Sequence, residues 1–343
     1  MRILVDVSHP AHVHLFRHAI EQFRADGHTV GVVSRGKDVT TDLLDAYGVS
    51  HVPISRTRDG VAALPREWLW RGLRLLRVAR SFKPDVILSR LNPTAAHVGR
   101  LLDVPNVVFH DTEAAGLVDR VTTPFAAVVC TPAEFGRDVG PSQRRYAGFH
   151  ELAYLHPARF DPDPTSLREA GVDPDERYAV VRLVGMDAHH DAGADGLPAA
   201  AVRSLVDGLG THGEVYVTSE RPLPAELVGH EPPVGPARIH QLLAFADVYA
   251  GDSGTMATEA GVLGTPSVRY DPLAAEMGNF AALGEYGLVV STTDADEAVE
   301  RALALAADGG ADARWKRRRR RLLADKIDVT AYITEIVTEV GSR

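Results

Sequence analysis

The chain is poor in cysteine, in positive charge and in long apolar runs. Its 343 residues include one cysteine, Cys130, which excludes a disulfide framework and a zinc site made of cysteines and fits a reducing cytoplasm. With 37 Lys and Arg against 46 Asp and Glu, the formal net charge is −9, so we expect no nucleic-acid partner. No stretch reaches about 18 apolar residues, and the opening MRILVDVSHP lacks the apolar segment of a signal peptide. We therefore expect a cytoplasmic protein without a membrane span.

The N-terminal half alternates short apolar runs with amphipathic stretches. Strands are expected at residues 2–7, 28–34, 49–55, 85–89, 104–110 and 126–130. Residues 12–26 carry apolar side chains at helical spacing, and residues 38–48 form a short helix that ends at a glycine. Strands that alternate with helices predict an α/β fold with a parallel, doubly wound sheet.

The same alternation returns after a Pro- and Asp-rich stretch at residues 155–176, which we interpret as a linker. The later strands are expected at 177–184, 214–219, 246–251, 265–270 and 287–292. The sequence thus predicts two tandem Rossmann-like domains, residues 1–154 and 177–326, and an amphipathic helix in 327–343 that returns to the first. Ligands bind beyond the carboxyl ends of such strands, so we expect the site in a cleft between the domains.

The loop at 251–266 reads GDSGTMATEAGVLGTP and opens a helix after a strand. Gly254 permits a tight backbone turn, and Ser253 and Thr255 supply hydroxyl groups. The first amides of a helix are unpaired and suit a diphosphate. Glu259 lies one turn further on the same face, where its carboxylate would accept hydrogen bonds from the hydroxyls of a ribose.

A plainer interpretation of this loop is an ordinary capped helix, with Asp252 or Ser253 as the N-cap. Outside it, Arg221 follows a strand and is either a phosphate ligand or a surface arginine. His240 begins a helix and is either close to the nucleotide or a satisfied helix-end histidine. The nucleotide-binding candidates are His9, Arg221, Asp252, Ser253, Gly254, Thr255 and Glu259.

Four histidines follow the first strand, in VSHPAHVHLFRHAIEQFRADGHTV at residues 7–30. They suggest a metal site, a catalytic base or chance. His9 and His12 lie in or next to the loop, whereas His14 and His18 are four residues apart on the helix, on a solvated or interdomain face. A metal would need a third ligand, which the sequence does not name. We expect no metal, and we interpret DAHHD at 187–191 as a polar loop that contacts the nucleotide or sugar.

The loop at 251–266 resembles the signature loop of the GT-B superfamily, and in particular that of the non-hydrolysing UDP-N-acetylglucosamine 2-epimerases. The resemblance implies that Ser253, Gly254 and Thr255 hold phosphate and that Glu259 holds the ribose. Thr258 replaces the first glutamate of the epimerase pair. HDTEAAG at 110–116 resembles the epimerase His-x-x-Glu-Ala-Gly motif and gives His110 and Glu113. The catalytic Pro-Glu-Glu of that family is absent, because residues 120–126 read RVTTPFA.

AHVHLFRHAIEQFRADGHTV resembles the first loop and helix of inverting GT-B glycosyltransferases, and His12 falls on their general base. An imidazole with a pKa near 6.5 suits removal of the proton from an acceptor hydroxyl. Asp111 or Glu113 would fix its tautomer. The helix N-terminus at Thr255 would stabilise the leaving nucleoside diphosphate.

The chain as a whole resembles domain-of-unknown-function family 354, a GT-B relative. The segments that carry this resemblance are HPAHVHLF, HDTEAAG, YAGFHELAYL (146–155), the loop at 251–266 and DVT (328–330). It implies a GT-B architecture. By this interpretation His150 and Glu151 line the cleft, and Tyr146 and Tyr154 pack at the hinge.

These features predict an inverting glycosyltransferase that uses a UDP-sugar, with no cofactor, and a glycan or lipid-linked acceptor. His12 is the expected base, and the further catalytic candidates are His110, Asp111 and Glu113. One alternative is a 2-epimerase that relies on those last three residues, and another is a non-catalytic nucleotide-sugar-binding protein. Residues 66–80 combine tryptophans with arginines, which predicts either peripheral membrane contact or a core helix with solvated arginines.

Overall fold

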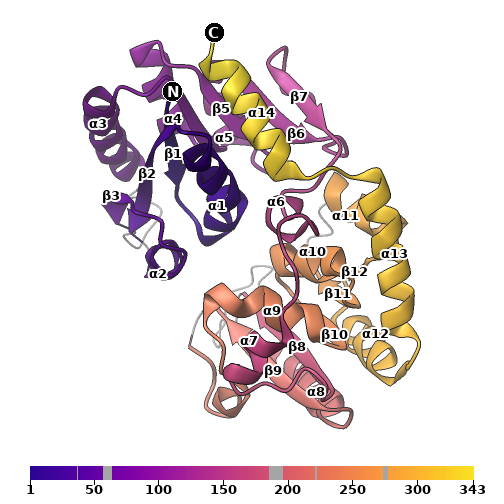
Figure 1. Ribbon diagram of the computed structural model, residues 1–343. Coiled ribbons are helices and arrows are strands. Elements are labelled where there is room, and N and C mark those ends of the chain that lie inside the picture. The colour runs from indigo at the N-terminus through magenta and orange to yellow at the C-terminus, as the bar shows by residue number, and fades with distance from the viewer. Residues whose placement is uncertain (37, 57–63, 185–195, 221, 273–276) are drawn as a thin grey trace. The chain divides into compact units, whose positions relative to one another are not determined.

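The computed structural model describes residues 1–36, 38–56, 64–184, 196–220, 222–272 and 277–343, and its elements are labelled in Figure 1. The chain forms two compact units. Unit 1 consists of Met1–Arg159 and Lys326–Arg343, and unit 2 consists of Phe160–Asp325. The stretch that the sequence marks as a linker therefore enters unit 2 at Phe160, and it contains a short helix, α7 Pro164–Glu169.

Unit 1 is built on a parallel sheet with the strand order β3-β2-β1-β4-β5-β6-β7 in the described residues. The strands are β1 Arg2–Val7, β2 Thr29–Gly36, β3 Val52–Arg56, β4 Val86–Arg90, β5 Asn106–Phe109, β6 Val128–Pro132 and β7 Gln143–Tyr146. The central strands are almost entirely buried, as their apolar runs require of a parallel sheet covered on both faces.

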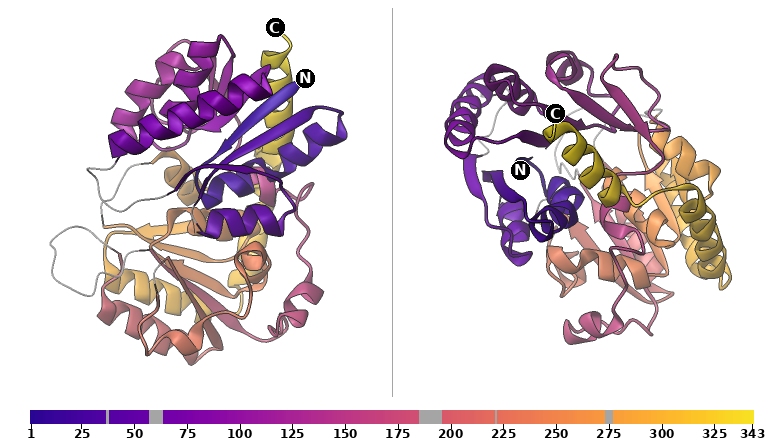
Figure 2. Two further views of the ribbon diagram at one scale, coloured as in Figure 1. Left: turned by 90° about the vertical axis from the view of Figure 1, so that its left-hand side faces the viewer. Right: turned by 45° about the horizontal axis from the view of Figure 1, so that its top comes forward.

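Helices cover both faces of this sheet, with α1 and α14 on one face and α3 and α4 on the other (Figures 1 and 2). The helices are α1 Pro10–Ala25, α2 Asp38–Ala46, α3 Leu64–Phe82, α4 Pro93–Leu102, α5 Gly116–Thr122, α6 Leu152–Leu155 and α14 Val329–Gly341. Local sequence explains where several begin: His9, Asn92 and Asp328 cap α1, α4 and α14 through their side chains. Helix α14 packs against α1 and α6 within unit 1.

Unit 2 contains a second parallel sheet, with the order β12-β11-β10-β8-β9 in the described residues. Its strands are β8 Tyr178–Leu183, β9 Glu214–Ser219, β10 Val248–Gly251, β11 Ser267–Tyr270 and β12 Val289–Thr292. Its helices are α7 Pro164–Glu169, α8 Ala199–Gly210, α9 Ile239–Phe245, α10 Gly254–Leu263, α11 Gly278–Glu285, α12 Ala295–Ala307 and α13 Ala311–Asp325. An apolar cluster lies between the sheet and helices α8 and α12.

The two sheets confirm the predicted fold class of two Rossmann-like doubly wound domains. Every predicted strand is present, with ends that differ from the prediction by three residues at most. The direction of strand order reverses between β1 and β4 in unit 1 and between β8 and β10 in unit 2. Open α/β sheets bind ligands at such switch points, so the loops after these strands are the places to examine. None of the helices within the described ranges is long and apolar enough to cross a membrane.

Candidate functional site

The loop after β10 lies at the switch point of unit 2 and leads directly into α10. Ser253 is the N-cap, because its Oγ accepts a hydrogen bond from the Met256 amide at 3.3 Å. The first backbone bond of the helix runs from the Ala257 amide to the Ser253 carbonyl. The amides of Gly254 and Thr255 precede these bonds, so they are the first-turn donors that remain for a ligand.

Asp252 connects this loop to the backbone on either side of residues 185–195. Its Oδ1 accepts a hydrogen bond from the Val184 amide at 2.7 Å, and its Oδ2 accepts one from the Leu197 amide at 3.1 Å. Both carboxylate oxygens of this nucleotide-binding candidate thus hold backbone amides. The DAHHD stretch at 187–191 and the candidate Arg221 lie outside the described residues.

Glu259 is buried, with 4% of its surface exposed, and forms a pair with His240 of α9. Its Oε1 lies 3.0 Å from His240 Nε2, and the edge of Phe160 covers the imidazole at a ring-centroid distance of 6.3 Å. The residue expected to hold a ribose and the second residue of α9 therefore form one buried acid–imidazole pair. Its two members are 19 positions apart in the sequence.

Arg269 is a site residue that the sequence did not single out. It stands at the carboxyl end of β11, in register with Gly251 of β10, and is 8% exposed. Its Nη2 forms an ion pair with Asp271, and its guanidinium carbon lies 3.7 Å from the centre of the Phe280 ring. Burial lowers the pKa of Arg269, and Asp271 opposes that shift. The one feature of the sequence that could have identified Arg269 is a charged residue near the end of an otherwise apolar strand.

The switch point of unit 1 carries the predicted base. His9 is exposed and caps α1, since its Nδ1 accepts a hydrogen bond from the Ala11 amide at 3.2 Å. His12 is 8% exposed, and its Nδ1 lies 3.3 Å from Ser8 Oγ and 3.4 Å from the Ser8 amide. Burial, followed by the charges of Arg90, His9 and His150, holds the pKa of His12 well below 6.5. His12 is therefore neutral at neutral pH, as a general base must be.

Asp111 follows β5 and orients His150. Its Oδ2 lies 2.8 Å from His150 Nδ1, and its Oδ1 pairs with Arg90 at the end of β4. Burial raises the pKa of Asp111, but Arg90 and His150 outweigh it and hold that pKa well below its ordinary value. His150 stacks on Tyr146, and its buried Nε2 has no hydrogen-bond partner among the described residues. One of the two carboxylates expected to fix the tautomer of His12 thus binds a different histidine.

The other two catalytic candidates of this unit lie in a network beside α5. His110 is 1% exposed, and its Nε2 lies 2.7 Å from Asp119, which also pairs with Arg137. Burial lowers the pKa of His110 to about 4, although Asp119 acts in the opposite direction. The Glu113 carboxylate accepts a hydrogen bond from the Gly136 amide at 3.1 Å. Both residues therefore have local structural partners.

The remaining histidines of the first helix have partners within unit 1, and His14 does not lie on the solvated or interdomain face that was expected for it. His14 is buried and lies against the rings of Tyr47 and Tyr154, with centroid distances of 5.8 and 5.3 Å. His18 lies 3.0 Å from Glu21 one turn further on. Within the part of the chain that the structure describes, no group of three His, Cys, Asp or Glu side chains could hold a metal ion.

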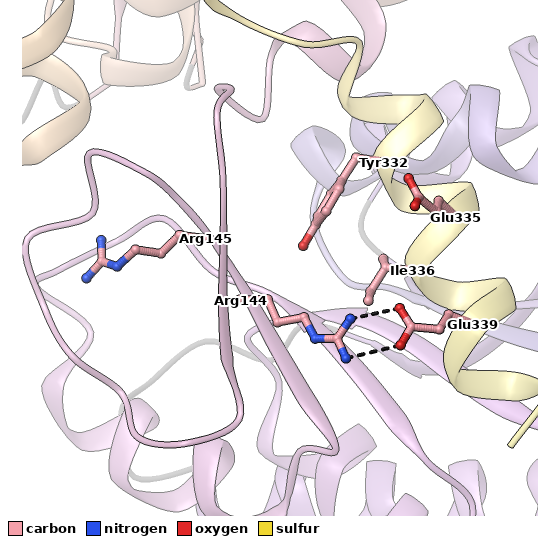
Figure 3. A pocket seen from close by; sticks show the side chains of 6 residues that line it. All are labelled: Arg144, Arg145, Tyr332, Glu335, Ile336 and Glu339. Carbon is pink, nitrogen blue, oxygen red and sulfur yellow. Dashed lines mark hydrogen bonds and ion pairs between the residues drawn. The ribbon is translucent and has the colours of Figure 1, made fainter.

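A polar pocket lies beside α14, and both of its arginines already have hydrogen-bond partners. It is lined by Arg144, Arg145, Tyr332, Glu335, Ile336 and Glu339 (Figure 3). Arg144 forms two bonds to Glu339, at 2.8 and 3.2 Å. Arg145 donates to backbone carbonyls, including that of Ala133 at 3.0 Å. These arginines bind strand β7 to neighbouring segments. The pocket is therefore a poor site for an anion.

Helix α3 combines a core face with an exposed apolar face. Leu75 and Ala79 are buried in the core. By contrast, Leu69, Trp70 and Leu73 are 64%, 55% and 51% exposed. The exposed arginines on the same helix are Arg74, Arg77 and Arg80. As far as its side chains are described, the helix thus has a core face and an outer face with exposed apolar and basic side chains, and membrane contact stays a prediction.

Comparison with known proteins bears on the fold and the family. Residues 1–170 match the family described as "Protein of unknown function (DUF354)". None of the curated proteins matches the chain. Among solved structures, the glycosyltransferase VinC in complex with DTDP is 15% identical, with a TM-score of 0.64 over 100% of both chains. The spinosyn rhamnosyltransferase SpnG, complexed with thymidine diphosphate, is 16% identical, with a TM-score of 0.64 over 98% of this chain and 100% of its own.

A third similar structure is that of SsfS6, a glycosyltransferase of Streptomyces sp. SF2575, which is 14% identical with a TM-score of 0.59 over 97% of this chain and 99% of its own. At these identities the likeness establishes the fold. It confirms the resemblance inferred from the sequence: residues 1–170 carry the DUF354 match, and the chain has the GT-B fold of glycosyltransferases.

Proposed function

We propose that this protein is an inverting glycosyltransferase that uses a nucleoside-diphosphate sugar. The observation that carries the proposal is the start of α10 at the switch point of unit 2. There, the amides of Gly254 and Thr255 precede the first hydrogen bonds of the helix and, among the described residues, are the donors left for a ligand. Such a helix start favours a diphosphate, and a diphosphate is both the charged part of a sugar donor and its leaving group.

The donor is proposed to be a pyrimidine nucleotide sugar, with UDP as the first choice and thymidine diphosphate as the second. Two structures of the same fold, VinC and SpnG, were solved with the thymidine nucleotide. Glu259 would accept hydrogen bonds from the ribose with the carboxylate that His240 orients at 3.0 Å. No metal is needed by this proposal, because the helix start supplies the positive potential.

The acceptor is proposed to be activated by His12 in unit 1. The neutral His12 ring has one unprotonated nitrogen, and this nitrogen takes the proton of the acceptor hydroxyl. The acceptor oxygen then bonds to the anomeric carbon as the bond from that carbon to the phosphate oxygen breaks. The nucleoside diphosphate leaves with the electron pair. The low pKa of His12 keeps the base form available in neutral solution.

The exposed face of α3 suggests where the acceptor is found. Leu69, Trp70 and Leu73 project from a helix whose other exposed residues include arginines. An amphipathic surface of this kind suits the interface of an anionic membrane. We propose on this basis that the acceptor is lipid-linked.

The first experiment is calorimetric titration of the purified protein with UDP, thymidine diphosphate, ADP and GDP. We expect one pyrimidine diphosphate to bind. Glu259→Gln should weaken it by about ten- to a hundredfold, because a charge-assisted hydrogen bond is lost. His12→Asn should bind the nucleotide as well as the wild type does. Failure of all four nucleotides to bind would overturn the proposal.

Measurement of the reaction products distinguishes a glycosyltransferase from an epimerase and from a binding protein. Incubation with UDP-N-acetylglucosamine alone would yield the manno isomer if the protein were an epimerase. A transferase instead releases UDP, slowly to water and faster with an acceptor. His12→Asn should lower that release at least about tenfold with the affinity for UDP unchanged. Nucleotide binding without release of UDP under any acceptor would identify a binding protein instead.

A further inference from the structure

We propose that Arg269 is a phosphoryl-anion ligand, which completes a subsite whose other donors are the first amides of α10. The inference deepens the proposed function and rests on it in one respect: it assigns the diphosphate of the sugar donor to this subsite. Arg269 belongs neither to the loop at 251–266 nor to the motifs that resemble the epimerases, so the sequence gives it no role.

Gly254 packs closely against Phe280 and Arg269, which places the guanidinium beside the start of α10. A Cβ atom built on Gly254 would lie 3.0 Å from Phe280 Cζ and 3.7 Å from Arg269 Nε. The guanidinium thus borders the first residue of α10, on the side where a side chain is missing. Register places Arg269 next to Gly251, the last residue of β10, so both groups lie at the carboxyl edge of the sheet. That edge is where ligands bind in open α/β sheets.

Neighbouring side chains hold the Arg269 guanidinium in place, but one of its N–H groups has no acceptor among the described residues. Its Nη2 pairs with Asp271, and its plane lies over the Phe280 ring at 3.7 Å. Its Nε is buried and has no hydrogen-bond partner within the described ranges. A buried donor without a partner destabilises the protein. An anion oxygen placed between Nε and the amides of α10 would remove that destabilisation and would also satisfy the helix start.

The chemistry of these donors selects the ligand. Arginine offers N–H groups in a fixed plane that suits phosphate oxygens, and a helix N-terminus favours negative charge. The same donors would stabilise the charge that develops on the diphosphate as the bond to the sugar breaks. Asp271 would disfavour an anion, so it serves here to orient the guanidinium.

Arg269 also has a purely structural explanation, in which it joins β11 to α11 through Asp271 and Phe280. The two explanations differ in what Asp271 does. If Arg269 is structural, Asp271→Asn and Arg269→Met break the same pair and have similar effects. If Arg269 binds the anion, Arg269→Met weakens binding, whereas Asp271→Asn leaves the affinity unchanged or tightens it, since it removes a negative charge.

The test is calorimetry with UDP, thymidine diphosphate, uridine, thymidine and inorganic pyrophosphate on four proteins. These are the wild type, Arg269→Met, Asp271→Asn and Arg301→Met. Arg301 is an exposed arginine of the same unit, on α12, so it controls for the loss of one positive charge. We expect Arg269→Met to weaken the diphosphates and pyrophosphate by about ten- to a hundredfold and to leave the nucleosides within twofold. Arg301→Met should match the wild type.

Each other outcome is decisive. If diphosphates bind the wild type and Arg269→Met equally well, the subsite is wrong while the proposed function stands. If pyrophosphate binds in an Arg269-dependent way but no nucleotide binds, the subsite stands and the proposed function falls. If nothing binds the wild type, both fall. Should Arg269→Met fail to fold, as thermal unfolding would show, Gly254→Ala places a methyl group beside the Arg269 guanidinium and should cause the same selective loss of the diphosphates.

Discussion

The buried histidines of unit 1 show how neighbours decide what one residue type does. His110 pairs with Asp119 at 2.7 Å, and His150 pairs with Asp111 at 2.8 Å. His12 lies beside the Ser8 hydroxyl and near the positive charge of Arg90. The first two imidazoles are therefore oriented by acids, and the third is kept neutral. Of these, His12 combines a neutral ring with a place at the switch point.

The burial of His110 predicts a pH dependence of stability. Its pKa is about 4 in the folded protein and near 6.5 in the unfolded chain. Between these values the unfolded state binds more protons, so stability falls as the pH falls. This residue should account for about 2 kcal/mol of lost unfolding free energy between pH 7.5 and pH 5. Urea unfolding of the wild type and His110→Gln at both pH values measures it. Equal losses in the two proteins would contradict the prediction.

At the residue scale, the sequence predicted local interactions and missed distant ones. The cap formed by Ser253 follows from a few neighbouring residues, and it is present. The pair of His240 with Glu259 and the pair of Asp111 with His150 join different elements, so no short motif contains them. Arg269 was missed for the same reason, because its role depends on Phe280 and on the start of α10.

At the scale of elements, strand β7 shows where periodicity fails. It consists of Gln143–Tyr146 at the edge of the first sheet, and its sequence QRRY has no apolar alternation. Its arginines bind Glu339 of α14 and backbone carbonyls, which replaces apolar burial as the reason for its position. The predicted strands were all apolar runs, which is why they were found.

The loop between β10 and α10 carries a testable structural role for Asp252. Its two oxygens hold the Val184 and Leu197 amides, on either side of residues 185–195. Asp252→Ala removes both charge-assisted bonds and should lower the free energy of unfolding by about 2–4 kcal/mol. Asp252→Asn keeps one acceptor oxygen and should cost about half as much. Chemical denaturation measures both. A loss of UDP affinity without a loss of stability would instead identify Asp252 as a direct ligand.

At the scale of the whole molecule, the alternation of strands and helices was enough to predict two Rossmann-like sheets. Right-handed crossovers and short connections leave few ways to order such strands. Composition and periodicity are therefore enough to predict this fold class. They do not say which surface side chains gather into a patch. For α3, the sequence left a membrane-facing helix and a core helix open. The exposed fractions of Leu69, Trp70 and Leu73 show that the helix has an outer apolar face.

This outer face predicts binding to anionic membranes. Sedimentation with phosphatidylcholine vesicles, with and without phosphatidylglycerol, should show the wild type bound to the anionic vesicles and released by salt. The variant Leu69→Ser/Trp70→Ser/Leu73→Ser should bind at least about tenfold more weakly, because each large apolar side chain contributes roughly 1.5–3 kcal/mol when buried. Leu101→Ser/Leu117→Ser removes two leucines that are 63% and 71% exposed elsewhere in unit 1 and should bind like the wild type. If the two variants bind equally, α3 does not face the membrane, and the lipid-linked acceptor loses its structural support while the donor subsite at α10 is unaffected.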